Sequence, residues 1–283
     1  MAGSVRRPCH FRPCRRLCTV LPFGFTSPRT TSLALRSAAR SKATAMVNLY
    51  PTLDPDGTIW RYMPLEQFLA ILATRTLHFQ PMSKMLDLAE RFSPATVRER
   101  LRDQSTTYPA GISSAQDVNK LDAQQREAAC ISCWHMNADE SAAMWSLHAQ
   151  RKGIAIRSTV RRFQSSFKEF PGNVMIAPIK YYSAADDDSY NDDAFYGNLF
   201  IKWKSYEHEH ELRALTFSTD GGQPYSADSG IDGINLPIEP SQLIEHLFVS
   251  PGVPNWIVSV VRETVKRYSF AFPIDKSTMN TLT

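Results

Sequence analysis

Residues 206–217 read Tyr-Glu-His-Glu-His-Glu-Leu-Arg-Ala-Leu-Thr-Phe, and this stretch does most to decide the fold. Up to Arg213 the residue types alternate, and an apolar run follows. Alternation with a period of two is typical of a β-strand, whose successive side chains point to opposite faces. Because the stretch continues into apolar residues, we expect a strand that enters the core and does not lie along an edge.

One face of this predicted strand carries three acids and an arginine: Glu207, Glu209, Glu211 and Arg213. The other face carries His208 and His210. Carboxylates in a row repel one another unless a cation or a function holds them together. The pattern therefore favours a catalytic or ligand-binding pair, Glu209 and Glu211, positioned by Arg213. The competing interpretation is a solvated strand with alternating charge.

Together with this stretch, the chain predicts about seven short strands, at residues 59–62, 76–80, 128–135, 153–159, 174–182, 206–217 and 244–250. Helical patterns lie between them without strict alternation. This order favours an α+β fold, a single domain with a mixed or antiparallel central sheet and flanking helices. Neither a P-loop nor a dinucleotide-binding glycine motif occurs in the sequence.

The charge of the chain is unevenly distributed. Residues 1–45 hold eight Arg and one Lys and no acidic residue, whereas residues 46–283 hold 23 basic and 28 acidic residues. The mildly acidic body gives no support for a nucleic-acid-binding face on the folded domain. No apolar run reaches the length of a membrane span, and the few cysteines of the body suit a reducing compartment, so we expect a cytoplasmic protein.

We expect residues 1–45 to be a disordered basic tail and residues 46–283 to be the folded domain. The tail is rich in Arg, Ser and Thr, which is typical of an organellar transit peptide. Alternatively, Met46 is the true start and the tail is translated upstream sequence. A third interpretation is a basic arm that binds anionic partners.

Outside residues 206–217, a few side chains are candidates for a site. Arg61 lies between Trp60 and Tyr62 in a predicted strand, where a buried arginine needs a carboxylate or an anionic ligand such as phosphate. Trp145 and His148 share one face of a short predicted helix. They are candidate ligand contacts, whereas the favoured structural interpretation makes Trp145 a core anchor and His148 a core or boundary histidine with satisfied hydrogen bonds.

Two cysteines also lie close together in the sequence. Cys130 and Cys133 are three residues apart in a predicted strand, so they point to opposite faces. No second cysteine pair accompanies them, which favours a structural role over a zinc or redox site.

Residues 59–268 resemble the bacterial family of unknown function numbered 2971. The resemblance rests on Met144-Trp145-x-x-His148-Ala149 followed by Gly153, and on Tyr206-x-x-Glu209-x-Glu211-x-Arg213. His148 stands where that family more often has tyrosine, and the segment with Asp87 and Glu90 lacks the expected Asn-Asp-Pro character. Membership would imply a bacterial cytoplasmic protein and supplies no activity.

The order of features is also similar to that of the ADP-ribosyltransferase fold. Those enzymes place an Arg or His on an early strand and a Glu-x-Glu on a late strand, on either side of NAD. Arg61 and the pair Glu209/Glu211 match this order, while Ser158-Thr159 is only a candidate for the middle motif. The resemblance implies NAD as the cofactor, a carboxylate at its ribose, and Arg61 at its pyrophosphate.

Three functions follow from these observations. The first is an enzyme that holds a nucleotide-like ligand with Arg61, Glu209 and Glu211 as catalytic residues and Arg213, Trp145, His148 and Tyr62 as ligand contacts. The second is a non-enzymatic binding or sensor module in which the glutamates and arginines form a structural network. The third is a metal-dependent hydrolase using His208 and His210, which have a His-x-His spacing but no companion motif. The sequence leaves open whether the protein is an enzyme.

Overall fold

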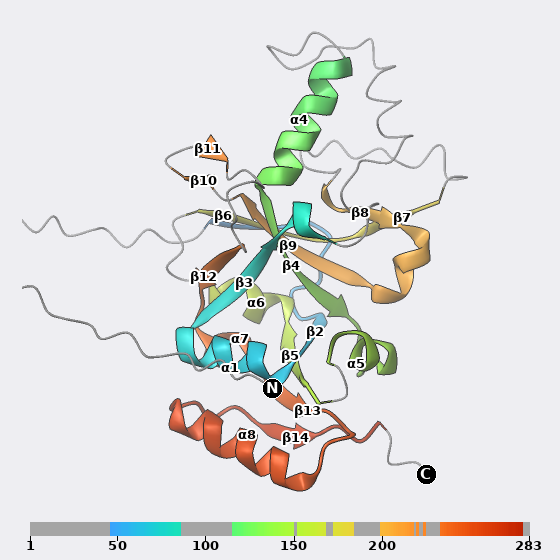
Figure 1. The fold of residues 1–283 in the computed structure, drawn as a ribbon. Coiled ribbons are helices and arrows are strands. Elements are labelled where there is room, and N and C mark those ends of the chain that lie inside the picture. Colours follow the sequence, from blue (N-terminus) through green and yellow to red (C-terminus); the bar gives the residue numbers. More distant parts are fainter. Residues whose placement is uncertain are drawn as a thin grey trace, which may run out of the picture. The chain divides into compact units, whose positions relative to one another are not determined.

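The computed structural model describes residues 46–85, 115–149, 152–167, 172–183, 199–217, 219–220, 223–224 and 233–279 (Figure 1). Residues 41–283 belong to one compact unit. The basic tail and the segment with Asp87 and Glu90 lie outside the described residues, so the expectations about them stay predictions.

The described elements are β1 (Met46–Leu49), β2 (Thr58–Met63), α1 (Leu65–Thr74), β3 (Thr76–Pro81), η1 (Met82–Lys84), α4 (Ala115–Ala128), β4 (Ala129–Met136), α5 (Ala142–His148), β5 (Ile154–Thr159), α6 (Val160–Ser166), β6 (Asn173–Pro178), β7 (Lys180–Tyr182), β8 (Ile201–Trp203), η3 (Lys204–Glu209), β9 (Glu211–Phe217), β10 (Thr219–Asp220), β11 (Gln223–Pro224), β12 (Ile234–Pro237), α7 (Pro240–Leu243), β13 (His246–Val249), α8 (Asn255–Arg267) and β14 (Ile274–Lys276).

A large mixed sheet organises the fold. Its main path runs β1-β6-β9-β4-β2-β5-β13-β14, and β3 and β12 complete its ten described strands beside this path. The β1–β6 and β13–β14 pairs are parallel, and the other pairs of the sheet are antiparallel. The predicted α+β class is confirmed, although the sheet has more strands than the seven expected.

Strand β4 lies at a fork in this sheet. Along one edge it pairs with β9 from Ala129 to His135. Its other edge is shared, because β3 pairs with residues 130–131 and β2 pairs with residues 135–136. In the described part of the chain, no strand pairs with residues 132–134 on that edge. The two neighbouring strands therefore diverge there, which opens the sheet locally.

Hydrophobic side chains of β2, β4, β5 and β9 fill the main core together with α1, α6 and α8. Gly153, just before β5, packs directly against the neighbouring backbone. A Cβ at this position would collide with the backbone oxygen atoms of Met63 and Ala149. The chain therefore reaches the centre of the sheet at a position where only glycine fits without a shift.

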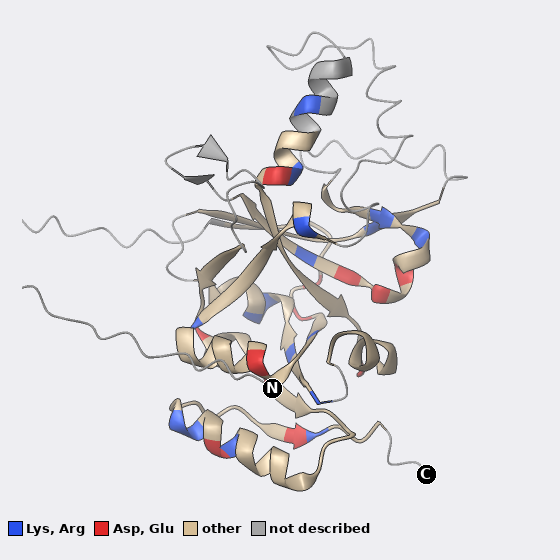
Figure 2. Ribbon diagram, viewed as in Figure 1, with Lys and Arg blue, Asp and Glu red and all other residues tan. Residues whose placement is uncertain are grey.

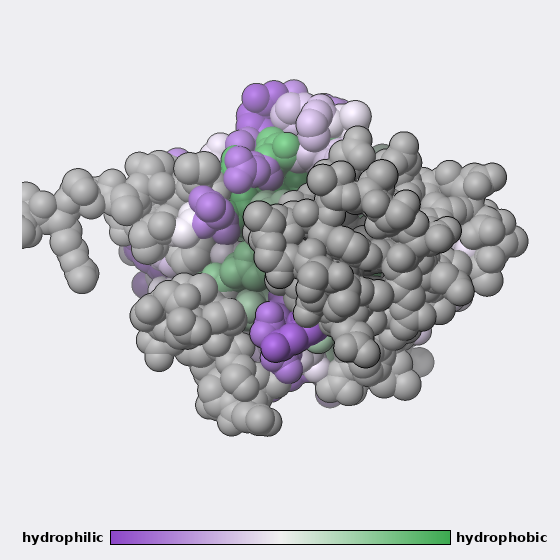
Figure 3. Space-filling model, turned by 90° about the horizontal axis from the view of Figure 1, so that it is seen from above, coloured by the Kyte–Doolittle hydropathy of each residue, from purple (hydrophilic) through white to green (hydrophobic). Residues whose placement is uncertain are grey.

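The described surface is mixed in character. In the view from above, hydrophobic residues in green lie beside hydrophilic residues in purple (Figure 3). In the described part of the chain, no helix combines the length and the apolar composition needed to cross a membrane.

Candidate functional site

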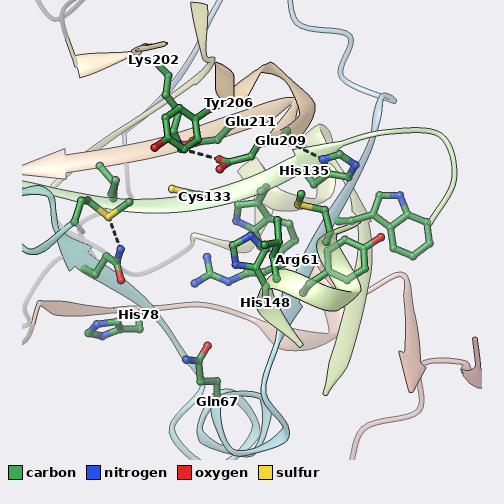
Figure 4. A pocket seen from close by; sticks show the side chains of 18 of the residues that line it. Arg61, Gln67, His78, Cys133, His135, His148, Lys202, Tyr206, Glu209 and Glu211 are labelled. Carbon is green, nitrogen blue, oxygen red and sulfur yellow. Dashed lines mark hydrogen bonds and ion pairs between the residues drawn. The ribbon is translucent and has the colours of Figure 1, made fainter. Parts of the chain in front are cut away.

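A pocket of about 640 Å³ opens at the fork of the sheet. Its lining residues belong mainly to β2, α1, β3, η1, β4, α5, β8, η3 and the start of β9. Figure 4 shows Glu209 and Glu211 together with Lys202 and Tyr206, while Arg61 and His148 face them from the middle of the view. The lining includes nine residues with polar or aromatic side chains around the glutamates: Arg61, Tyr62, Cys133, His135, His148, Lys202, Tyr206, Glu209 and Glu211.

The chain turns sharply before it enters β9, which corrects the single strand predicted for residues 206–217. Residues 204–209 form the 3-10 helix η3, and His210 takes a left-handed conformation with φ of 40°. The His210 carbonyl accepts a hydrogen bond from the backbone N–H of Met136 at 2.8 Å. Glu207 and Glu209 thus lie on a turn, and only Glu211 and Arg213 share a strand face.

Four charged side chains meet at this turn. Both Arg213 Nε and Nη2 donate to the carboxylate of Glu211, at 2.7 and 3.2 Å. Lys202 Nζ donates to Glu209 Oε2 at 2.6 Å and to Glu211 Oε2 at 3.3 Å. Figure 2 shows acidic and basic positions following one another along η3 and β9. The charges therefore balance locally, with Lys202 bridging the two glutamates.

The Glu211 carboxylate is held in its charged form. Its side chain is 3% exposed, and this burial acts to raise its pKa. The charges of Arg213 and Lys202, with hydrogen bonds from Arg213 and Cys133, outweigh burial and lower the pKa to about 2. A buried carboxylate with these partners is a structural anchor of the pocket wall.

Replacement of Glu211 by glutamine is expected to remove a pH-dependent part of the stability. The folded pKa of about 2 lies below the ordinary value of 4.5, so Glu211 stabilises the fold fully above about pH 4.5. This contribution, about 3 kcal/mol, is lost as the pH falls towards 2. In urea unfolding, the advantage of the native protein over Glu211→Gln should shrink in acid. Glu207→Gln on η3 is the control, and parallel pH profiles for native and Glu211→Gln proteins would contradict the assignment.

Arg61 is a half-buried cation of the pocket wall, and burial lowers its pKa. One guanidinium N–H donates to the Ser132 hydroxyl, and the guanidinium carbon lies 5.8 Å from the centre of the Trp134 ring. No carboxylate of the described residues forms an ion pair with it. The predicted pairing of Arg61 with the glutamates is therefore absent there, while the alternative of an anionic ligand fits.

Glu209 is the accessible carboxylate of the pocket. Its side chain is 20% exposed, and Lys202 contacts only Oε2. Within the described residues, Oε1 has no hydrogen-bond partner. Glu209 can thus accept a hydrogen bond from a ligand, which Glu211 with its occupied oxygen atoms is less able to do.

Two further predicted contacts line the pocket. Burial raises the pKa of Tyr62 above its usual range, and the Tyr62 hydroxyl accepts a hydrogen bond from the backbone N–H of Ser141 at 2.8 Å. His148 is exposed at the rim, and partial desolvation of its ring by the pocket walls, with the nearby charges of Lys202 and Arg61, lowers its pKa. Tyr62 therefore contributes a ring surface and His148 a neutral imidazole.

Two residues predicted as ligand contacts, Arg213 and Trp145, do not line the pocket. Arg213 is completely buried and also donates to the Leu199 carbonyl at 2.8 Å. Trp145 is 5% exposed, and its indole N–H donates to Glu140 at 2.8 Å. Both side chains support the pocket from behind and are out of reach of a ligand in it.

Several pocket residues were not predicted from the sequence. Cys133 and His135 lie two apart on β4, so both point into the pocket, while Cys130 is buried in the core on the opposite face. Strand alternation would have placed Cys133 and His135 together. Nothing in the sequence indicates Lys202, whose place depends on the pairing of β7 with β8.

The described part of the chain contains no set of side chains arranged to bind a metal ion. No group of three or more His, Cys, Asp and Glu side chains there is arranged to hold an ion. His208 is exposed and hydrogen-bonds the Ser205 carbonyl at 3.2 Å. Within the described residues, the hydrolase interpretation therefore finds no third ligand for His208 and His210.

Comparisons with known proteins give one structural likeness. No family model matches the chain, and no curated protein matches its sequence. The structure of Thermus sp. 2.9 DarT in complex with NAD+ matches with a TM-score of 0.34 and 10% sequence identity, covering 80% of this chain and 98% of that chain. A likeness at this level identifies no function.

Proposed function

We propose that the pocket binds a nucleotide, with NAD as the candidate, and that the protein is an ADP-ribosyltransferase-like enzyme. The observation that carries this proposal is that one pocket holds both a cation without a carboxylate partner and a carboxylate oxygen without a donor. Arg61 has no carboxylate partner in the described chain, and Glu209 has an oxygen atom without a donor. A ligand with both an anionic group and hydroxyl donors matches these two needs.

The anionic part of the ligand would bind at Arg61. Its guanidinium is fixed from one side by Ser132 and Trp134, which leaves other N–H groups for phosphate oxygens. A half-buried arginine with no carboxylate partner costs free energy, and a phosphate offsets that cost. A pyrophosphate suits this wall better than a single carboxylate because it offers several oxygen atoms.

The sugar and the base would fill the remaining space. The volume of about 640 Å³ lies within the range of roughly 300–1,000 Å³ for small-molecule sites. Glu209 Oε1 is available to a ribose hydroxyl. The rings of Tyr62 and Tyr206 line the same pocket and offer faces for a base.

These residues suit a transfer of ADP-ribose. The bond between ribose and nicotinamide breaks, and nicotinamide leaves with the bonding electrons. An acceptor nucleophile then forms the new bond to the ribose carbon and gives up its proton. Positive charge develops on the ribose in this step, and a fixed carboxylate such as Glu209 stabilises it. Lys202, which is itself bound to Glu211, holds Glu209 in place.

Binding of NAD to the full chain is the first test. Calorimetric titration should show saturable binding, a thermal-shift assay should show stabilisation, and chromatography should detect released nicotinamide. Arg61→Gln is expected to weaken binding by roughly 10–100-fold, the loss of a hydrogen bond to a charged group.

The exposed Arg161 is the matched control, because it pairs with Asp56 on the surface. Arg161→Gln should bind NAD like the native protein. The melting temperature of each variant without ligand shows whether the fold is kept. Absence of both NAD binding and nicotinamide release in the native protein would refute the proposal, as would equal losses in the two arginine variants.

A further inference from the structure

His135 is a buried side chain with one unsatisfied nitrogen atom. It projects from β4, is 6% exposed and lines the pocket. Its Nδ1 lies 2.6 Å from the backbone carbonyl oxygen of Glu209. Its Nε2 is buried and has no hydrogen-bond partner in the described structure. Figure 4 shows the ring beside Glu209, held by the first of these contacts.

The chemistry of the two nitrogen atoms follows from this contact. A carbonyl oxygen only accepts, so Nδ1 must carry the hydrogen and donate it. In a neutral imidazole, Nε2 then has a lone pair and is an acceptor. Burial lowers the pKa of His135, and the neighbouring His210 and His208 act in the same direction against the opposing effect of Glu209. The neutral form is therefore favoured at neutral pH.

Buried acceptors in native proteins are rarely left without a donor. An unsatisfied acceptor on a pocket wall therefore indicates a donor that arrives with the ligand. Glu209 Oε1 is a second acceptor in the same pocket, and the Glu209 backbone fixes the His135 ring. The two acceptors thus belong to residues that are in direct contact, so neighbouring donors on one ligand would meet both of them.

We propose that His135 Nε2 accepts a hydrogen bond from a ribose hydroxyl, and that together with Glu209 it makes the pocket selective for an intact vicinal diol. This inference rests on the proposed nucleotide function and adds a specificity-determining residue to it. The required ligand class is a nucleotide with both ribose hydroxyls. A sugar that lacks one of them leaves a buried acceptor unpaired and binds more weakly.

The test compares NAD with four analogues, each lacking the 2′- or 3′-hydroxyl of one of its two riboses. The native full chain is expected to bind both analogues that lack a hydroxyl of the recognised ribose at least roughly tenfold more weakly than NAD. One of these two analogues lacks the hydroxyl that donates to His135. In His135→Asn the amide N–H can still donate to the Glu209 carbonyl, but the acceptor at Nε2 is gone. This variant should bind NAD and that analogue with equal affinity.

Two further variants sharpen the result. His78 lies at the pocket rim and hydrogen-bonds Asn235 at 3.0 Å, so His78→Asn is the matched control and should keep the discrimination. His135→Gln places an amide oxygen near the position of Nε2 and should retain part of the discrimination, and it serves if His135→Asn does not fold.

The outcomes separate the two proposals. Failure of the native protein to bind NAD overturns both. Binding of NAD with undiminished discrimination in His135→Asn overturns only the role of His135. Equal weakening of NAD and all analogues in that variant assigns His135 a purely structural role and also overturns the inference.

Discussion

Replacement of Arg213 by methionine is expected to lower the free energy of unfolding by about 3–5 kcal/mol, the usual cost of removing one partner of a buried ion pair. Arg213 is completely buried and supplies two of the N–H donors that hold Glu211. Methionine keeps the bulk and the unbranched shape of the side chain. The loss therefore comes from the undercompensated Glu211 carboxylate, which keeps only the contact with Lys202 at 3.3 Å and the hydrogen bond from Cys133 within the described structure.

Urea unfolding at neutral pH measures this effect. Arg161→Met removes an ion pair of similar length, with Asp56 at 2.9 Å against 2.7 Å for Arg213 and Glu211, but on the exposed surface. That control should not change stability measurably, because exposed pairs contribute little. In the double variant Arg213→Met with Glu211→Leu, both charges are gone and much of the stability should return. Native-like stability of Arg213→Met would refute the anchoring role of this pair.

The same network shows where sequence reasoning succeeds. The apolar run after Arg213 identified β9, and alternation correctly placed Glu211 and Arg213 on one face and Cys130 opposite Cys133. These are local properties of a strand that is buried on both sides. Successive side chains of a strand point to opposite faces whatever surrounds it, so these placements can be predicted from the sequence.

The break before β9 could not be predicted in this way. The alternating acids and histidines of residues 206–210 fit a strand as well as they fit a turn. The turn depends on the left-handed His210 and on its bond with Met136, a contact across the sheet. The fork of β2 and β3 along β4 is equally non-local. Arg61 and Glu209 were therefore identified as residues, but the pocket that joins them was not.

The second large expected effect is a loss of turnover when Glu209 is replaced. Glu209→Gln is expected to lower the rate of nicotinamide release at saturating NAD by roughly 10²–10³-fold, the usual loss when a fixed electrostatic group at the reacting centre is removed. Glutamine keeps an oxygen atom for the contact with Lys202, so the pocket should keep its shape. NAD affinity should change much less than the rate, since the charge matters most in the transition state.

Glu207 provides the comparison that isolates this charge. It lies on the same 3-10 helix two residues earlier, is exposed and does not line the pocket. Glu207→Gln therefore removes an equal charge at nearly the same place in the chain and should leave turnover unchanged. If both variants lose turnover equally, the loss comes from the reduced negative charge around η3 and not from the position of Glu209 in the pocket. If Glu209→Gln keeps more than about half of the native rate, Glu209 stabilises no transition state. A selective loss in Glu209→Gln, with an unchanged melting temperature, would place the reacting ribose beside the free oxygen atom of this carboxylate.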